Sequence, residues 1–178
     1  KVAFPISISS LISSFGKNID SFTIVRFLKN FLTEEEAKIE YGILSGKIDS
    51  LCSLPFALNV AFVTTMVPNI SKSMARGDKE EVKNKIEKFI FISILIALPM
   101  SAIMFMFPKQ IMHLLFPNAQ SGAIYLKVSS IAVVFMILTQ TMSGILQGIG
   151  KASIPPIALG IGMIIKFLCN IFLVPNPK

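Results

Sequence analysis

The chain has 178 residues, of which 53% are hydrophobic and 15% are charged, and its mean hydropathy is +0.70. This composition excludes an ordinary soluble domain and indicates an integral membrane protein built from helices. The net charge of +7 would suggest nucleic-acid binding in a soluble protein. Six of the seventeen basic residues, however, fall in one short segment beside an apolar run, so we expect a role in membrane topology and no nucleic-acid partner.

The first predicted span covers residues 2–28. It is uncharged as far as Gly16, and one face of it is polar. At 100° per residue, seven polar residues fall within less than half of the helix circumference: Ser7, Ser10, Ser13, Ser14, Lys17, Asp20 and Ser21. Because unsatisfied polar groups are costly in hydrocarbon, this face must look into protein or water.

A capping box precedes the second predicted span. Thr33 is followed three residues later by Glu36, so a helix is expected to begin here and to run into the uncharged span 50–71. A helix of that length, at about 1.5 Å per residue, crosses the roughly 30 Å hydrocarbon layer. Basic residues then cluster in the segment 72–88: Lys72, Arg76, Lys79, Lys83, Lys85 and Lys88. Clustered Lys and Arg near span ends stay in the cytoplasm, so we predict a cytoplasmic loop here.

The third predicted span covers residues 89–107. A second capping signal, Asp78 with Glu81, precedes it and predicts a helix that runs through charged turns into the span. Its only polar side chains are those of Ser93 and Ser101. We therefore expect this span to be the one most exposed to lipid.

Two further spans complete the chain. The fourth covers residues 128–149, where Gly144 and Gly148 form a small-xxx-small pair that favours close helix approach. The fifth covers residues 154–174 and opens with two prolines, which suit a first helical turn. Lys166 falls near the middle of the fifth span.

The five spans predict a multi-pass protein of the cytoplasmic membrane. Since the spans alternate in direction, the cytoplasmic loop at 72–88 also places the N-terminus in the cytoplasm and the C-terminal end outside. The chain opens without an initiator methionine and closes just after a span, so we interpret it as a piece of a longer protein.

No motif indicates an enzyme or a metal site. The sequence has no P-loop, HExxH, nucleophile elbow or CxxC pair. Ionisable residues inside spans are functional candidates, which selects Lys17, Asp20 and Lys166. The structural alternatives are that Lys17 and Asp20 neutralise each other, and that Lys166 pairs with a helix beyond this chain. Three polar residues fit helix–helix contacts better than ligand binding: Gln140, Gln147 and Asn170.

Three stretches carry a family resemblance: SLPFALNVAFVTTMVPNISKSMARGDKEEV, ILQGIGKASIPP, and the K-x-x-x-N of Lys166 and Asn170 that ends at Leu173-Val174-Pro175. They resemble the stage V sporulation protein B family. That family is a polysaccharide-exporter branch of the superfamily that also holds multidrug and toxin extrusion transporters and MurJ-type lipid II flippases. The resemblance covers essentially the whole chain. It implies an all-α fold in which five transmembrane helices, spans seven to eleven, form part of the C-terminal lobe of a two-lobe flippase.

The resemblance also implies partners. Family members move lipid-linked saccharides across the cytoplasmic membrane, and this branch is associated with spore cortex peptidoglycan. The implied partners are a polyprenyl-pyrophosphate-linked saccharide, membrane lipid and the N-terminal lobe of the same protein. In MurJ-like proteins a sodium ion can sit between the seventh span and a later one. The resemblance therefore makes Asp20 the natural cation ligand and Asn170 a second one, with sodium or a proton as coupling ion and no other cofactor.

A central cavity follows from these expectations. Lys17 and Lys166, with Ser14, Ser21 and Gln140, would line it and attract the pyrophosphate, because lysine–phosphate attraction is far stronger in a desolvated site than in water. The polyprenyl tail would stay in lipid while the lobes alternate access. Two alternatives remain open. A cation-coupled multidrug antiporter would need carboxylates in the cavity, and a membrane scaffold that binds cell-wall assembly proteins would use the polar face for assembly alone.

Overall fold

The computed structural model describes residues 33–117 and 121–173. This part of the chain contains helices and no strand, which confirms the predicted all-α class. The helices are, in order: α2 (Glu34–Gly42), the π-helix η1 (Ile43–Ile48), α3 (Asp49–Ala75), α4 (Lys79–Met106), α5 (Pro108–Leu115), α6 (Ala123–Gly148) and α7 (Ile154–Leu173). The first predicted span, residues 2–28, lies outside the described residues.

Three helical runs are long and apolar enough to cross a membrane. They cover residues Glu34–Ala75, Lys79–Met106 and Ala123–Gly148, and a shorter apolar stretch covers Ile154–Cys169. The predicted spans overlap α3, α4, α6 and α7. Three such helices in the described residues indicate a multi-pass membrane protein.

The predicted capping box opens the longest of these runs. The Thr33 amide donates to Glu36 Oε2 (3.0 Å), and the Glu36 amide donates to Thr33 Oγ1 (3.3 Å). These two bonds satisfy amide groups that the first helical turn leaves without intrahelical partners. From this cap, α2, η1 and α3 continue as one helix to Ala75, as the sequence predicts.

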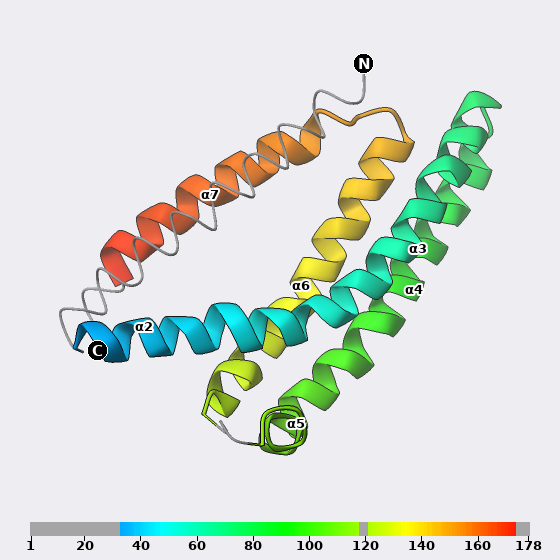
Figure 1. Ribbon diagram of the computed structural model, residues 1–178. Coiled ribbons are helices and arrows are strands. Elements are labelled where there is room, and N and C mark those ends of the chain that lie inside the picture. The colour runs from blue at the N-terminus through cyan, green and yellow to red at the C-terminus, as the bar shows by residue number, and fades with distance from the viewer. Residues whose placement is uncertain (1–32, 118–120, 174–178) are drawn as a thin grey trace. The chain divides into compact units, whose positions relative to one another are not determined.

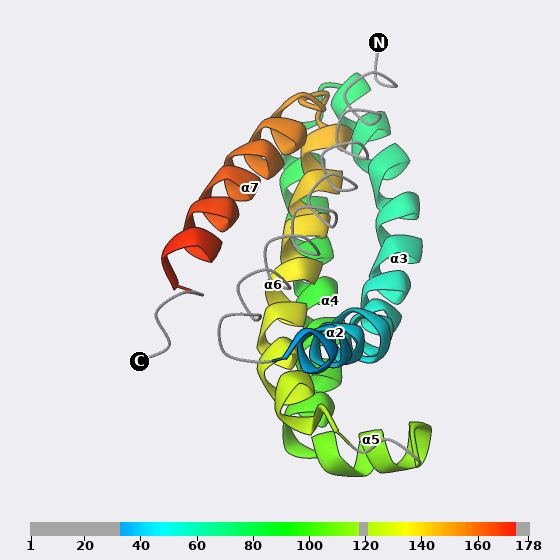
Figure 2. The same cartoon turned by 60° about the vertical axis from the view of Figure 1, so that its left-hand side comes forward.

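The chain divides into two compact units. Of the described residues, one unit contains 33–42 and 152–173, and the other, which we call the three-helix unit, falls within residues 43–151. Within the three-helix unit, α3, α4 and α6 pack against one another, and α5 contacts α4 and α6 (Figures 1 and 2).

The core of the three-helix unit follows one stripe along each long helix. On α3 the buried residues Cys52, Asn59, Met66 and Ser73 recur every seven residues, a spacing that keeps one face turned toward neighbouring helices. Two apolar clusters result. The first contains Ile48, Leu51, Cys52, Ala97, Met104, Met112, Leu126, Val133 and Ile137, and the second contains Met66, Ile70, Val82 and Ile145.

Helices α3 and α6 approach closely at the predicted glycine pair. A Cβ atom on Gly144 would lie 2.5 Å from a methyl carbon of Val63, and one on Gly148 would lie 2.8 Å from Ile70 Cβ. Neither position has room for a side chain. The Ser71 hydroxyl reinforces the contact by donating to the Gly148 carbonyl oxygen (3.0 Å). The small-xxx-small prediction is confirmed.

The basic segment 72–88 is mostly helical. Helix α3 ends at Ala75 and α4 begins at Lys79, where the Asp78 side chain accepts from the Glu81 amide (2.8 Å), as the second capping signal predicts. Lys85 is half-buried and joins the two helices. Its ammonium group donates to Ser73 Oγ (2.7 Å) and to the Asn69 carbonyl oxygen (3.3 Å), and it pairs with Glu81 Oε1 (2.7 Å). The Lys85 hydrogen bond holds the pKa of Glu81 below its usual value.

The glycine contact predicts a specific loss of stability. Gly148→Ala forces α6 away from Ile70, and overpacking of this kind costs about 1 to 3 kcal/mol. Gly160→Ala in α7 is the matched control because nothing lies within 4 Å of a Cβ built there. Unfolding of purified protein can be followed with a thiol-reactive dye on the buried Cys52, after the exposed Cys169 has been replaced by serine. Equal melting temperatures for the two variants would contradict the close packing.

Candidate functional site

A cluster of buried polar side chains lies at the centre of the three-helix unit. The Asn59 side chain of α3 is fully buried, and its amide nitrogen donates to three oxygens of α6. These are the carbonyl oxygen of Ile137 (3.3 Å), Oε1 of Gln140 (3.1 Å) and Oγ1 of Thr141 (3.2 Å). One side chain of α3 thus binds two successive turns of α6.

Ser93 brings the third helix into the same cluster. Its hydroxyl, on α4, donates to Asn59 Oδ1 (3.2 Å) and lies 2.8 Å from Thr141 Oγ1. Thr141 in turn donates to the Ile137 carbonyl oxygen of its own helix (3.0 Å). Ser93 and Thr141 are both fully buried. Every polar side chain of this Asn59 cluster (Asn59, Ser93, Gln140 and Thr141) therefore has a hydrogen-bond partner from another member.

The Asn59 cluster lies deep along all three helices. At 1.5 Å per residue, Asn59 is about 15 Å from the start of α3, Ser93 roughly 20 Å from either end of α4, and Thr141 about 11 Å from the end of α6. Apolar side chains pack along the helices on both sides of it. These apolar side chains keep water away from the hydrogen bonds of the cluster. If the helices separated, the polar groups would be left in an apolar layer.

The chemistry of the Asn59 cluster favours helix association. None of its four members is ionisable, so it holds no group that could donate or accept a proton near neutral pH. The hydrogen bonds link α3 to α6, α3 to α4 and α4 to α6. This arrangement fixes the register of the three helices against one another.

Gln140 is the predicted cavity residue that the structure places in this cluster. It is partly buried and accepts from Asn59, which agrees with the alternative reading of Gln140 as a helix–helix contact. Ser93 and Ser101 are the two polar side chains of the third predicted span, which is no more buried than the other two long helical runs. Both serines are buried, and Ser101 donates to the Ser130 carbonyl oxygen of α6 (2.6 Å). The face of α4 that carries Phe91, Leu95 and Leu98 is exposed.

The remaining predicted site residues lie elsewhere in the chain. Lys166 is exposed on α7, about 18 Å from the start of that helix and about 11 Å from its end. Its neighbours Ile165 and Phe167 are also exposed. Four candidates lie outside the described residues: Ser14, Lys17, Asp20 and Ser21. Asn170 belongs to α7, but its side chain also lies outside what the structure describes.

Asn59 and Thr141 are the residues that sequence reasoning missed. Neither residue carries a charge that would mark it inside a span, and neither belongs to the polar face predicted for residues 2–28. The available signal was the seven-residue spacing of Cys52, Asn59 and Met66, which places an amide on a buried stripe. A polar residue on such a stripe requires a partner on a neighbouring helix.

Comparisons with known proteins point to one transporter family. The MatE family profile matches residues 41–172. The membrane protein YabM of Bacillus subtilis is 30% identical over 171 residues, which is 96% of the chain and 32% of that protein. The lipid II flippase MurJ of the same organism is 27% identical over 143 residues, 75% of the chain and 25% of MurJ.

A third relative is named for a different substrate class. The probable multidrug resistance protein NorM of Thermotoga maritima is 27% identical over 173 residues, 94% of the chain and 33% of that protein. The chain thus spans about a third or less of the length of these relatives. No solved structure matches the chain.

The Asn59 cluster predicts a second stability effect. Asn59→Ala removes the amide that joins the three helices and leaves Ser93 and Thr141 with fewer partners, which should cost about 1 to 3 kcal/mol. Asn69→Ala is the matched control, because the exposed Asn69 amide donates only along its own helix to the Thr65 carbonyl oxygen. Melting temperatures from the same thiol-dye assay should fall for the first variant and stay nearly constant for the second. A comparable fall in both would contradict the role of the cluster.

Proposed function

Because the chain belongs to the MatE family, we propose that it forms part of the C-terminal lobe of a flippase for lipid-linked saccharides. The substrate is a peptidoglycan or polysaccharide precursor on a polyprenyl pyrophosphate, as expected for the stage V sporulation protein B branch. The similarity to MurJ, a lipid II flippase, supports this substrate class. The protein would move its substrate across the cytoplasmic membrane by alternating access between two lobes.

The observation that carries the proposal is the distribution of charge. All ten acidic residues of the sequence lie at or before Glu87, whereas lysines continue to the end of the chain. Helices α6 and α7 therefore contain no carboxylate, and Lys166 lies within the apolar length of α7. A midplane lysine costs about 2.5 to 3.5 kcal/mol on insertion scales, so its retention favours a role in anion binding.

The proposed cavity keeps the residues selected from the sequence. Lys166 and Lys17 would bind the pyrophosphate, and Ser14, Ser21 and Gln140 would provide hydrogen bonds at its wall. The side-chain oxygen of Gln140 already accepts a hydrogen bond from Asn59, so its amide nitrogen would donate to the substrate. Asp20, with Asn170, would hold a coupling sodium ion or proton. The missing half of the cavity would come from the N-terminal lobe.

A multidrug antiporter is the second candidate. The similarity to NorM covers 94% of the chain, more than the 75% covered by MurJ, which favours this alternative. A cationic drug would need an anionic cavity, and the sequence offers Asp20 as the acidic residue deep in a predicted span. The charge distribution therefore favours the anionic lipid.

The basic segment also gives a topology proposal. The Lys72, Arg76, Lys79, Lys83 and Lys88 side chains are exposed around the α3–α4 turn. Segments of this kind are retained in the cytoplasm. The N-terminus of the chain would then be cytoplasmic, and α5 would lie at the outer surface.

Cysteine labelling tests this topology. Single cysteines at the exposed positions Lys79 and Gln110 are placed in a background that lacks Cys52 and Cys169. An impermeant thiol reagent applied to intact cells should label Gln110→Cys, and it should label Lys79→Cys after permeabilisation alone. The opposite pattern would overturn the orientation.

Substrate binding tests the role of Lys166. Lys166→Gln keeps hydrogen-bonding capacity but deletes the charge, so affinity for a polyprenyl-pyrophosphate sugar should fall roughly tenfold or more. Lys166→Arg should retain part of the affinity. Lys109→Gln, on the exposed side of α5, is the control and should bind normally. Binding is measured on the purified protein in detergent, and unchanged affinity of Lys166→Gln at unchanged melting temperature would contradict the proposal.

A further inference from the structure

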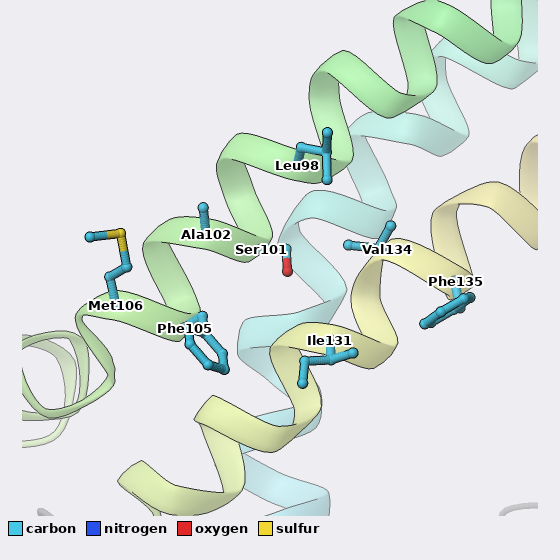
Figure 3. A pocket seen from close by; sticks show the side chains of 8 residues that line it. All are labelled: Leu98, Ser101, Ala102, Phe105, Met106, Ile131, Val134 and Phe135. Carbon is cyan, nitrogen blue, oxygen red and sulfur yellow. The ribbon is translucent and has the colours of Figure 1, made fainter.

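An open groove of about 470 Å³ runs along the surface of the three-helix unit between α4 and α6 (Figure 3). Its walls are apolar and exposed, with Leu98 54% and Phe135 66% accessible. The groove is lined chiefly by Leu98, Ala102 and Phe105 of α4 and by Ile131, Val134 and Phe135 of α6. The hydroxyl of Ser101, also in its lining, donates to the Ser130 carbonyl oxygen, so this polar group is already satisfied. The groove thus suits a hydrocarbon chain.

The length of the groove matches one membrane leaflet. From Leu98 to Met106 it extends for about 12 Å along α4, at 1.5 Å per residue. One half of the roughly 30 Å hydrocarbon layer is about 15 Å deep. A single acyl chain that enters at one end of the groove would therefore reach close to the midplane.

Helix α5 marks the end of the groove that lies at the membrane surface. It is short, runs crosswise to α4 and α6 (Figure 2), and packs Met112 into the core while Lys109 and Gln110 are exposed. A short helix that buries one face and exposes polar side chains on another suits the interface between water and lipid. The Phe105 end of the groove, next to α5, therefore lies at headgroup depth.

A cation stands at this end. Lys127 lies one turn before Ile131 on α6, and its ammonium nitrogen is 4.9 Å from the centre of the Phe105 ring. Lys127 is exposed, and in the described part of the chain no carboxylate pairs with it. The aromatic contact holds the ammonium group over the groove mouth, where its positive charge complements a lipid phosphate.

We propose that the α4–α6 groove and Lys127 form a site for one anionic glycerophospholipid, with its headgroup phosphate on Lys127 and one acyl chain along the groove. The length and apolar lining of the groove match the acyl chain of any phospholipid. The positive charge of Lys127 adds a preference for a lipid with an anionic headgroup. A single lysine suits one phosphate. The site lies wholly within the three-helix unit and does not depend on the transported substrate.

Photocrosslinking in nanodiscs tests the site. The purified protein is reconstituted in phosphatidylcholine that contains a minor fraction of either phosphatidylglycerol or phosphatidylcholine with a diazirine in the acyl chain. Crosslinked peptides are then quantified by mass spectrometry. Peptides that cover residues 98–106 and 131–135 should react about fivefold more with the phosphatidylglycerol probe, since a basic residue at the surface gives about this preference.

Three variants distinguish a site from general lipid contact. Lys127→Gln should reduce the yield of the anionic probe to that of the neutral probe, and Lys127→Glu should reduce it further. Ala102→Phe fills the groove and should lower the yields of both probes. The Lys109→Gln control, on α5, should change neither yield. Equal yields for the two probes in the wild-type protein, or an undiminished preference in Lys127→Gln, would mean that bulk lipid covers the groove and would overturn the proposal.

Discussion

The hydrogen bonds of the Asn59 side chain join all three long helices of the three-helix unit at one point. Apolar side chains give little preference for a neighbouring helix over lipid, since both surroundings are hydrocarbon. Association within a membrane therefore depends on close packing and on polar groups that lack other partners. Asn59 contacts oxygens of α6 and accepts from Ser93 of α4, so three helices meet at one amide group.

The rest of the unit is consistent with this central contact. On one side, Gly144 and Gly148 allow α6 to approach α3, and on the other, Ser101 bonds the backbone of α6 from α4. Lys85 ties the ends of α3 and α4 together beyond the glycine contact. These contacts use the faces of the helices that meet in the core, whereas Leu98 of α4 and Phe135 of α6 lie on exposed faces.

Such a unit suits a transporter that works by movement of packed groups of helices. Alternating access is largely rigid-body motion of one helix bundle against another around a fixed binding site. The three-helix unit has the internal hydrogen bonds that a rigid body needs. The charged candidates for substrate binding lie outside it, with Lys166 on α7 and Lys17 on the first predicted span. Gln140 is the one candidate for substrate binding that also belongs to the Asn59 cluster.

Local features of the sequence predicted local features of the structure. The Thr33 and Asp78 caps and the Gly144–Gly148 pair depend on neighbours within a few residues or on helix geometry alone, and the structure confirms all three. The Asn59 cluster could not be predicted in the same way. Its members Asn59, Ser93 and Thr141 are far apart in the sequence, and only the packing of three helices brings them together.

Lys85 illustrates the limit of counting charges. Its position in a basic segment predicted a topology signal, but three internal contacts give it a structural role as well. The sequence could not distinguish it from Lys83, which lies two residues earlier on α4 and stays exposed. Hydropathy was enough to predict the fold class. The structural role of Lys85 could be recognised only from its contacts in the folded chain.

The dependence of the three-helix unit on the Asn59 cluster is tested most directly by a double-mutant cycle. The free energy of unfolding would be measured for the wild type, Asn59→Ala, Thr141→Val and the double variant in one detergent. A direct hydrogen bond between Asn59 and Thr141 predicts a coupling energy of about 0.6 kcal/mol or more, the average for such bonds within membranes. Strictly additive losses from the two single substitutions would contradict the account.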